Sequence, residues 1–165
     1  MLITGLFHLA IRTADLETTI AFYTRVLGLK EVPRPTAIKF PGAWLAVPTP
    51  GGQAVIHVYA GSAATDPDGA IPIDNESGVA DHLSLSAHGF LEFREKFKSL
   101  GITWREQNNG GSNWQMFVHD PNGLKVELTF EQSAEPGLPA PIPDVNRYKA
   151  AERFFSRDEY ARAVE

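Results

Sequence analysis

Residues 7–29 read FHLAIRTADLETTIAFYTRVLGL, and residues 81–102 read DHLSLSAHGFLEFREKFKSLGI. Each stretch begins with an alternating segment that contains His-Leu, continues as a helical segment, and ends on Leu-Gly before an aliphatic residue. The histidine that opens the first copy is His8, and its counterpart in the second copy is His82. This internal repeat predicts two copies of one folding unit.

The local elements of each copy follow from hydrophobic periodicity. A two-residue alternation predicts a half-buried first strand, which places His8 and His82 on the face opposite the aliphatic side chains. Asp15 is the expected N-cap of the first helix, because its carboxylate can accept an unpaired backbone N–H. The apolar stripes expected to cover the sheets are Leu16, Ile20, Tyr23 and Leu27 in the first copy and Phe90, Phe93, Phe97 and Leu100 in the second.

Three further strands are expected in each copy. They lie around 37–40, 43–48 and 53–59 in the first copy, and around 103–106, 113–118 and 124–130 in the second. Hairpin turns are expected at Gly51-Gly52 and at Asp120-Pro121-Asn122-Gly123. The predicted fold class is α+β, with two βαβββ modules pairing into a curved mixed sheet around a metal cleft, plus a C-terminal helical tail.

Composition shifts mark the expected domain boundaries. The first module spans 1–60, a linker loop rich in Ala, Asp, Pro and Gly spans 61–79, and the second module spans 80–130. Residues 131–165 form a Pro-rich linker followed by a short amphipathic helix from about residue 145 to 164. This tail has no counterpart in the repeat.

Four residues of metal-ligand type lie at repeat-equivalent positions. His57 and Glu127 point away from the apolar residues of the last strand of each copy, as His8 and His82 do on the first strand. A pseudo-two-fold between the units would bring all four together. Because the chain has no cysteine, the ligands must be nitrogen and oxygen atoms, which suits one divalent ion of Zn, Ni, Mn or Fe(II).

Charge and hydropathy exclude other classes of function. The net charge is -5 and no Lys/Arg cluster is present, so we expect no nucleic-acid partner. No stretch approaches the roughly 20 apolar residues that span a bilayer, and the first residues do not resemble a signal peptide. We therefore expect a cytoplasmic protein with no membrane partner. The remaining histidines, His88 and His119, are expected to be surface residues.

The repeat, together with the closing DPNGLKVE of residues 120–127, resembles the vicinal-oxygen-chelate superfamily. That superfamily includes glyoxalase I, extradiol dioxygenases, methylmalonyl-CoA epimerase, fosfomycin-resistance transferases and bleomycin-binding proteins. The resemblance covers about residues 5–130 and implies the fold above. It also implies a small-molecule substrate and a homodimer, in which some members exchange modules between chains.

The resemblance carries over metal ligands at His8, His82 and Glu127. It also implies a ligand at the position of His57, where glyoxalase I usually has Glu, so the choice of reaction depends on this residue. An Arg at the offset of Arg12 resembles the group that pairs with a glutathione carboxylate in bacterial glyoxalase I. Three aromatic side chains are candidates for an apolar substrate pocket: Trp44, Tyr59 and Trp114.

Three functions fit these residues. The leading hypothesis is an enzyme of the glyoxalase I type, a lyase or isomerase with glutathione as a candidate co-substrate. The metal would chelate vicinal oxygens and stabilise an enediolate while Glu127 moves a proton. The second is an Fe(II) extradiol dioxygenase with a triad of His8, His82 and Glu127, in which His57 acts as an acid or base. The third is a bleomycin-like binding and resistance protein without chemistry. No sequence feature favours a fosfomycin-type transferase.

Overall fold

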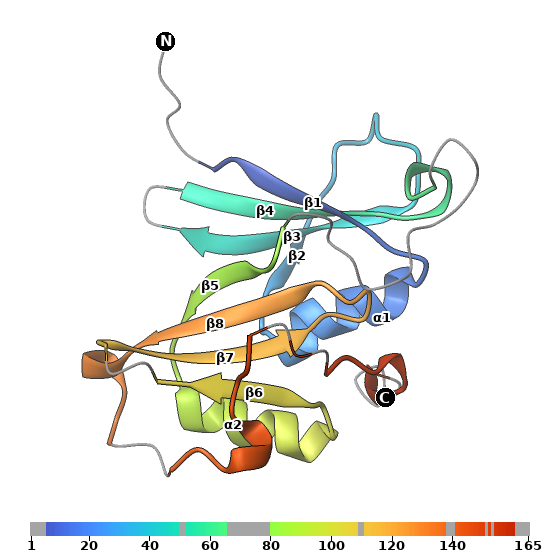
Figure 1. The fold of residues 1–165 in the computed structure, drawn as a ribbon. Coiled ribbons are helices and arrows are strands. Elements are labelled where there is room, and N and C mark those ends of the chain that lie inside the picture. Colours follow the sequence, from blue (N-terminus) through green and yellow to red (C-terminus); the bar gives the residue numbers. More distant parts are fainter. Residues whose placement is uncertain are drawn as a thin grey trace. The chain divides into compact units, whose positions relative to one another are not determined.

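The computed structural model describes residues 6–49, 52–65, 80–108, 111–137, 141–150, 152 and 154–160. The chain divides into two compact units, with the boundary between residues 74 and 75. Each unit contains one four-stranded sheet with a helix between its first and second strands (Figure 1). The predicted α+β class with two βαβββ modules is therefore confirmed.

The first unit consists of β1 (His8–Arg12), α1 (Leu16–Ala21), β2 (Lys30–Val32), β3 (Gly42–Thr49) and β4 (Gly52–Tyr59), with a π-helical segment (Phe22–Val26) directly after α1. The strand order is β1-β4-β3-β2. β1 runs parallel to β4, and the other two pairs are antiparallel. A 3-10 turn (Gly61–Ala63) follows β4.

The second unit repeats this plan with β5 (Leu83–Ala87), α2 (Phe90–Leu100), β6 (Trp104–Gln107), β7 (Asn113–His119) and β8 (Lys125–Glu131). The strand order is β5-β8-β7-β6, again with one parallel pair, between β5 and β8. The turn predicted after β7 is confirmed. Asp120 closes it, because its Oδ1 accepts the backbone N–H groups of Asn122 and Leu124 at 2.9 and 2.8 Å. Gly123 supplies the positive φ of 88° that the turn requires.

The helix of the first unit begins as predicted but continues differently. Asp15 caps it, since its Oδ1 accepts the backbone N–H of Thr18 at 3.0 Å. The π-helical continuation has wider turns than an α-helix, so the buried face no longer follows the predicted spacing. Tyr23 is fully buried as predicted, but its buried neighbours are Phe22 and Val26. The predicted stripe members Leu16, Ile20 and Leu27 are only half-buried.

The prediction of a strand at 37–40 is wrong. The corresponding strand is β2, which follows the helix directly and pairs with β3. Prolines at 33, 35 and 41 surround the predicted segment, and the backbone N–H of Ile38 donates to the Pro35 carbonyl at 3.1 Å, which forms a turn. Proline lacks the backbone donor that a sheet ladder needs. The turn predicted at Gly51 lies outside the described residues, as does most of the predicted linker.

The core of the second unit lies between its sheet and α2. Phe90 and Phe97 are buried, whereas Phe93 and Leu100 of the predicted stripe are half-buried. Phe90 packs against Trp114 and Phe130, with ring centroids 5.4 and 5.2 Å apart. One face of this sheet is thus covered by α2 (Figure 1), and the alternate side chains of its strands point to the other face.

The predicted C-terminal helix is not present in the described part of the tail. The helical elements described between residues 141 and 160 are two short 3-10 turns, Asp144–Asn146 and Arg157–Tyr160, while residues 151, 153 and 161–165 lie outside the described ranges. The tail instead pairs with the edge of the sheet. The backbone N–H of Tyr148 donates to the Glu106 carbonyl at 2.8 Å, and an isolated parallel bridge joins Arg147 to Glu106. At the bridge, the backbone of Arg147 is extended.

No helix within the described ranges is long and apolar enough to cross a membrane.

Candidate metal centre

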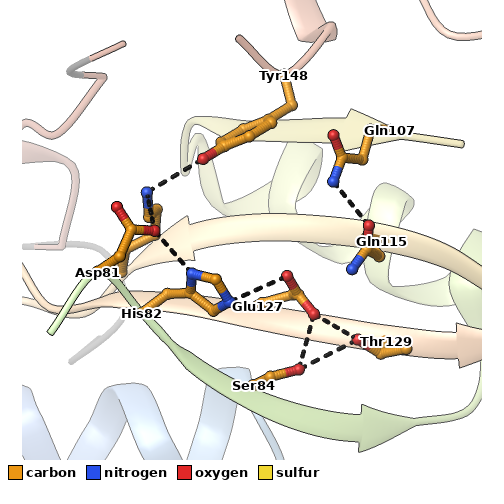
Figure 2. A network of polar contacts seen from close by, with 9 residues as sticks. Asp81, His82, Ser84, Gln107, Gln115, Glu127, Thr129 and Tyr148 are labelled. Carbon is orange, nitrogen blue, oxygen red and sulfur yellow. Dashed lines mark hydrogen bonds and ion pairs between the residues drawn. The ribbon is translucent and has the colours of Figure 1, made fainter. Parts of the chain in front are cut away.

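His82 and Glu127 face each other in the second unit. His82 directly precedes β5, and Glu127 lies at the centre of β8, beside Ser84 in the parallel register. His82 Nε2 and Glu127 Oε2 are 3.3 Å apart (Figure 2). Both side chains come from the face that α2 does not cover, as the alternation predicted. This brings together two residues separated by 45 positions in the sequence.

The other nitrogen of His82 is held by its neighbour in the chain. His82 Nδ1 lies 2.7 Å from Asp81 Oδ1, and the hydrogen bond to His82 lowers the pKa of Asp81, with Lys125 adding to the effect. Because an ionised carboxylate only accepts, Nδ1 of His82 carries the proton in this pair. In the neutral imidazole, Nε2 then has a free lone pair directed toward Glu127. Carboxylate–histidine pairs orient metal-bound histidines in the same manner.

Two hydroxyl groups orient the Glu127 carboxylate. Ser84 Oγ and Thr129 Oγ1 each donate to Glu127 Oε1 at 2.7 Å, which leaves Oε2 facing His82. Burial alone would raise the pKa of Glu127, but hydrogen bonds from Thr129, Ser84 and Gln115 outweigh burial and lower it. The side chain is 9% exposed, yet it is ionised at neutral pH. The ionised carboxylate of Glu127 therefore faces His82 Nε2 directly.

This pair fits a divalent metal ion. Metal bonds of about 2.0 to 2.2 Å place neighbouring ligand atoms roughly 3.0 to 3.4 Å apart in octahedral or tetrahedral geometry. The separation of 3.3 Å between His82 Nε2 and Glu127 Oε2 lies in that range. A carboxylate oxygen and the lone pair of a neutral imidazole nitrogen are both metal-ligand atoms, so a cation between them would be bound by both.

In the first unit, His57 is the centre of an aromatic stack. Its ring lies 4.3 Å from Trp44 at an interplanar angle of 6°, and 4.2 Å from His8 at 18°. Burial lowers the pKa of His57, and the positive charges of His8 and Arg34 lower it further. The imidazole is therefore kept neutral, which is the form that binds metals. His8, at the start of β1, is exposed.

The two histidines of the first unit fit a common ion only in part. The lone pairs of an imidazole lie in the ring plane, so two nearly parallel rings about 4 Å apart do not direct nitrogen atoms at one point. Convergence requires that one ring turn. The exposed ring of His8 can do so at little cost, whereas His57 is held against Trp44. The structure thus supports the His82–Glu127 pair more strongly than the His8–His57 pair.

The predicted substrate-binding residues divide between two environments. Arg12 and Tyr59 lie on the same strand face as His57, since β1 and β4 are in parallel register there. Trp44 adjoins His57 directly. Trp114, by contrast, is 3% exposed beneath α2, on the face opposite to Glu127. The prediction that Trp114 lines a substrate pocket does not agree with this position, because β7 directs alternate side chains to opposite faces.

Comparison with known proteins shows the family of this chain. The model of the Glyoxalase/Bleomycin resistance protein/Dioxygenase superfamily matches residues 5–128. The chain belongs to this superfamily. It is 32% identical over 139 residues to a lactoylglutathione lyase of Salmonella typhimurium and 33% identical over 141 residues to one of Escherichia coli; each alignment covers 81% of this chain and 97% of the relative. A glyoxalase/dioxygenase structure from Nostoc punctiforme has the same fold, with a TM-score of 0.60 at 19% identity over 78% of this chain and 91% of that one.

Two of the four predicted metal ligands lie in each unit of the chain. The first unit supplies His8 and His57, and the second supplies His82 and Glu127. Within the described ranges, no three His, Asp or Glu side chains gather in one cluster that could hold a metal ion.

Sequence reasoning missed the polar groups that orient His82 and Glu127. Ser84 and Thr129 lie on the same strand face as Glu127, so the two-residue alternation contained a usable signal for them. Asp81 precedes the predicted strand, and no pattern in the sequence connects Lys125 to Asp81.

A hollow of about 370 Å³ lies on the sheet face that carries Glu127. Its lining includes Ser86, Ser112, Asn113, Thr129 and Glu131.

The two histidines expected at the surface differ. The side chain of His88 is 81% exposed, in agreement with the prediction. His119 is half-buried, packed edge-on against Phe154 of the tail at 4.4 Å. Its buried Nδ1 has no hydrogen-bond partner in the part of the chain that the structure describes. Burial, with Lys125 and Arg105 nearby, lowers the pKa of His119 to about 4. The surface assignment of His119 is wrong because the tail covers it.

Proposed function

We propose that the protein is a metal-dependent lyase or isomerase of the glyoxalase I type, with His8, His57, His82 and Glu127 as ligands of one divalent metal ion. The observation that carries the proposal is the His82–Glu127 pair, in which two electron-pair donors 3.3 Å apart are each oriented from behind. Each unit contributes two of the four proposed ligands. The lactoylglutathione lyases among the relatives support this choice of reaction.

The bound ion, which can be Zn, Ni, Mn or Fe(II), would hold and polarise two neighbouring oxygen atoms of a small substrate. Glu127 moves the proton. It is ionised at neutral pH, and its Oε1 is occupied by two hydroxyl donors. Its Oε2 can bind an ion or take a proton but not both at once, so we expect it to be released from the ion while it takes a proton from a carbon beside a carbonyl and returns it to the adjacent carbon.

The substrate-binding residues follow from the strand faces. Arg12 supplies a guanidinium for a carboxylate of glutathione as co-substrate, and it shares a strand face with His57. Trp44 and Tyr59 provide aromatic surface beside the imidazole. The polar hollow that includes Thr129 accepts hydroxyl or carbonyl oxygens of the substrate, since its lining is rich in hydroxyl and amide groups.

The decisive assay measures formation of lactoylglutathione from methylglyoxal and glutathione by protein loaded with Ni or Zn. Glu127→Gln is expected to lower kcat by at least about a hundredfold, because the amide cannot take the proton. Glu95→Gln is the matched control, since Glu95 is exposed on α2 and pairs only loosely with Lys98, at 4.0 Å. Absence of turnover with both metals would refute the proposal.

One observation favours a second function, an Fe(II)-dependent ring-cleaving dioxygenase. His57 is held in the stack with Trp44, which suits an acid or base beside the metal better than a ligand. His8, His82 and Glu127 would then form a two-His-one-carboxylate triad. Metal analysis of His57→Ala purified without chelator separates the two: loss of the metal makes His57 a ligand, and retained metal with lost activity makes it an acid or base. Oxygen uptake with catechols and Fe(II) tests the dioxygenase reaction itself.

A further inference from the structure

We propose that the C-terminal tail is part of the metal centre, with Tyr148 as a positioning residue that acts on His82 through Lys125 and Asp81. The inference rests on the proposed function, since it concerns the same metal site. It deepens that function, because it assigns a role to a segment that lies beyond the residues matched by the family model. Every contact that carries it lies within the second unit.

The tail is attached to the sheet at the edge strand β6. The backbone N–H of Tyr148 donates to the Glu106 carbonyl at 2.8 Å, and Asn146 Nδ2 donates to the Trp104 carbonyl at 3.2 Å. Arg105, which also lies on β6, forms an ion pair with Glu152 of the tail, with 3.1 Å between Arg105 Nη2 and Glu152 Oε1. These bonds fix the backbone on both sides of Tyr148 and thereby define where its side chain lies.

The Tyr148 ring covers the face of the sheet that carries Glu127. It stacks on Phe117 with ring centroids 3.9 Å apart and an interplanar angle of 17°. Phe117 is the register partner of Glu127 on the neighbouring strand, and its ring meets the imidazole of His82 edge-on at 6.1 Å. The ring of Phe117 therefore contacts both Tyr148 of the tail and the candidate ligand His82.

A chain of polar contacts leads from Tyr148 to His82 (Figure 2). Lys125 Nζ donates to the Tyr148 hydroxyl at 3.1 Å and lies 2.8 Å from Asp81 Oδ1. The same Asp81 oxygen lies 2.7 Å from His82 Nδ1. The side chain of Asp81 is 70% exposed, whereas that of Lys125 is only 12% exposed. An exposed carboxylate changes rotamer freely, so the enclosed ammonium group is what keeps Asp81 beside the imidazole.

Tyr148 encloses Lys125 in two ways. Its hydroxyl accepts a hydrogen bond from Nζ, and the ammonium group lies 5.5 Å from the centre of its ring. Removal of the side chain would release Lys125 to solvent and allow Asp81 to leave His82. The neutral imidazole would then lose its preference for carrying the proton on Nδ1. That preference is what leaves the lone pair of Nε2 available to bind a metal ion. Loss of such outer partners typically weakens metal binding by about 10- to 100-fold.

The first test measures the His82 tautomer in the metal-free full-length protein by long-range proton–nitrogen correlation of labelled histidine, above the ionisation range of imidazole. We expect the Nδ1-protonated form to dominate in the wild type, and the Nε2-protonated share to rise in Tyr148→Phe and further in Tyr148→Ala. Tyr160→Phe is the matched control. It removes a tail hydroxyl that donates to the His119 carbonyl and lies outside this chain of contacts.

The second test measures Zn affinity by chelator competition. Tyr148→Ala is expected to bind Zn about tenfold more weakly, and Tyr148→Phe several-fold more weakly, while Tyr160→Phe binds as the wild type does. The tautomer readout needs no metal and no turnover, so a wild type that binds no Zn counts against the proposed function alone. Unchanged tautomer populations in both Tyr148 variants would overturn the positioning role. An equal loss of affinity in Tyr160→Phe would also overturn it, because a general structural effect of the tail would then explain the result.

Discussion

Replacement of Glu106 by Gln is expected to destabilise the second unit by about 3 kcal/mol. Glu106 is fully buried, and its carboxylate accepts from Arg94 Nε at 3.0 Å, Arg94 Nη2 at 2.6 Å and Trp104 Nε1 at 2.7 Å. Glutamine keeps one oxygen for two of these donors, but its amide NH₂ would face the third donor, and the guanidinium would lose its counter-charge.

The magnitude follows from the environment of the pair. Two unit charges about 4 Å apart attract by about 4 kcal/mol at the effective dielectric of a protein. Loss of one partner of a buried pair costs about 3 to 5 kcal/mol. The Arg94 side chain is 14% exposed, so water compensates part of this loss and the lower end of the range applies.

Urea unfolding followed by tryptophan fluorescence measures the effect, since Trp104 contacts Glu106 directly. Glu95→Gln is the matched control on α2. Glu95 pairs with Lys98 at 4.0 Å on the exposed side of that helix, so its replacement should change stability by less than about 0.5 kcal/mol. A Glu106→Gln variant whose stability stays within about 0.5 kcal/mol of the wild type would contradict the assignment of a strong buried ion pair.

Three further predictions concern the site, the pH dependence and the first helix. Ser84→Ala removes a donor to Glu127 and should weaken Zn binding about tenfold in chelator competition, whereas Ser86→Ala should not. The pKa of His119 is lowered from 6.5 to about 4, so the unfolded state binds the proton first and stability falls as the pH drops through this window. Between about pH 7 and pH 5 the loss should be about 1 kcal/mol after allowance for partial exposure, and His119→Gln should abolish this part of the pH dependence of urea midpoints. Asp15→Ala removes the helix cap and should lower the unfolding free energy by about 1 kcal/mol, against no more than about 0.5 for the exposed Glu17→Ala.

The strand alternation was sufficient to predict which candidate ligands share a face. Each β-strand directs successive side chains to opposite sides, so the apolar neighbours of His57 and Glu127 determine where these two residues point. The N-cap at Asp15 and the turn closed by Asp120 were also predictable, because both depend on side chains that bond to backbone groups within four residues.

Predictions that depended on an ideal helix or on apolar content were less successful. The π-helical segment after α1 changed the buried stripe, and a Pro-flanked apolar segment at 37–40 forms a turn rather than a strand. Trp114 was predicted to line a substrate pocket because its side chain is large and aromatic, but its position in β7 directs that side chain under α2. The surrounding prolines decided the turn at 37–40, and packing under α2 decided the environment of Trp114; hydrophobic periodicity along the chain contains neither.

The sequence by itself determined the two-copy architecture and the strand faces, and it predicted four candidate donor residues, since all of these depend on the two-residue period and on an internal repeat. Only the tertiary structure brought His82 within 3.3 Å of Glu127, placed Ser84 and Thr129 on the carboxylate, and connected Tyr148 to His82 through Lys125 and Asp81. Individual contacts of this set join residues as far apart in the sequence as His82 and Glu127, which are 45 positions apart. They depend on strand register and on the attachment of the tail to β6, which arise from the burial of the whole unit rather than from any local pattern.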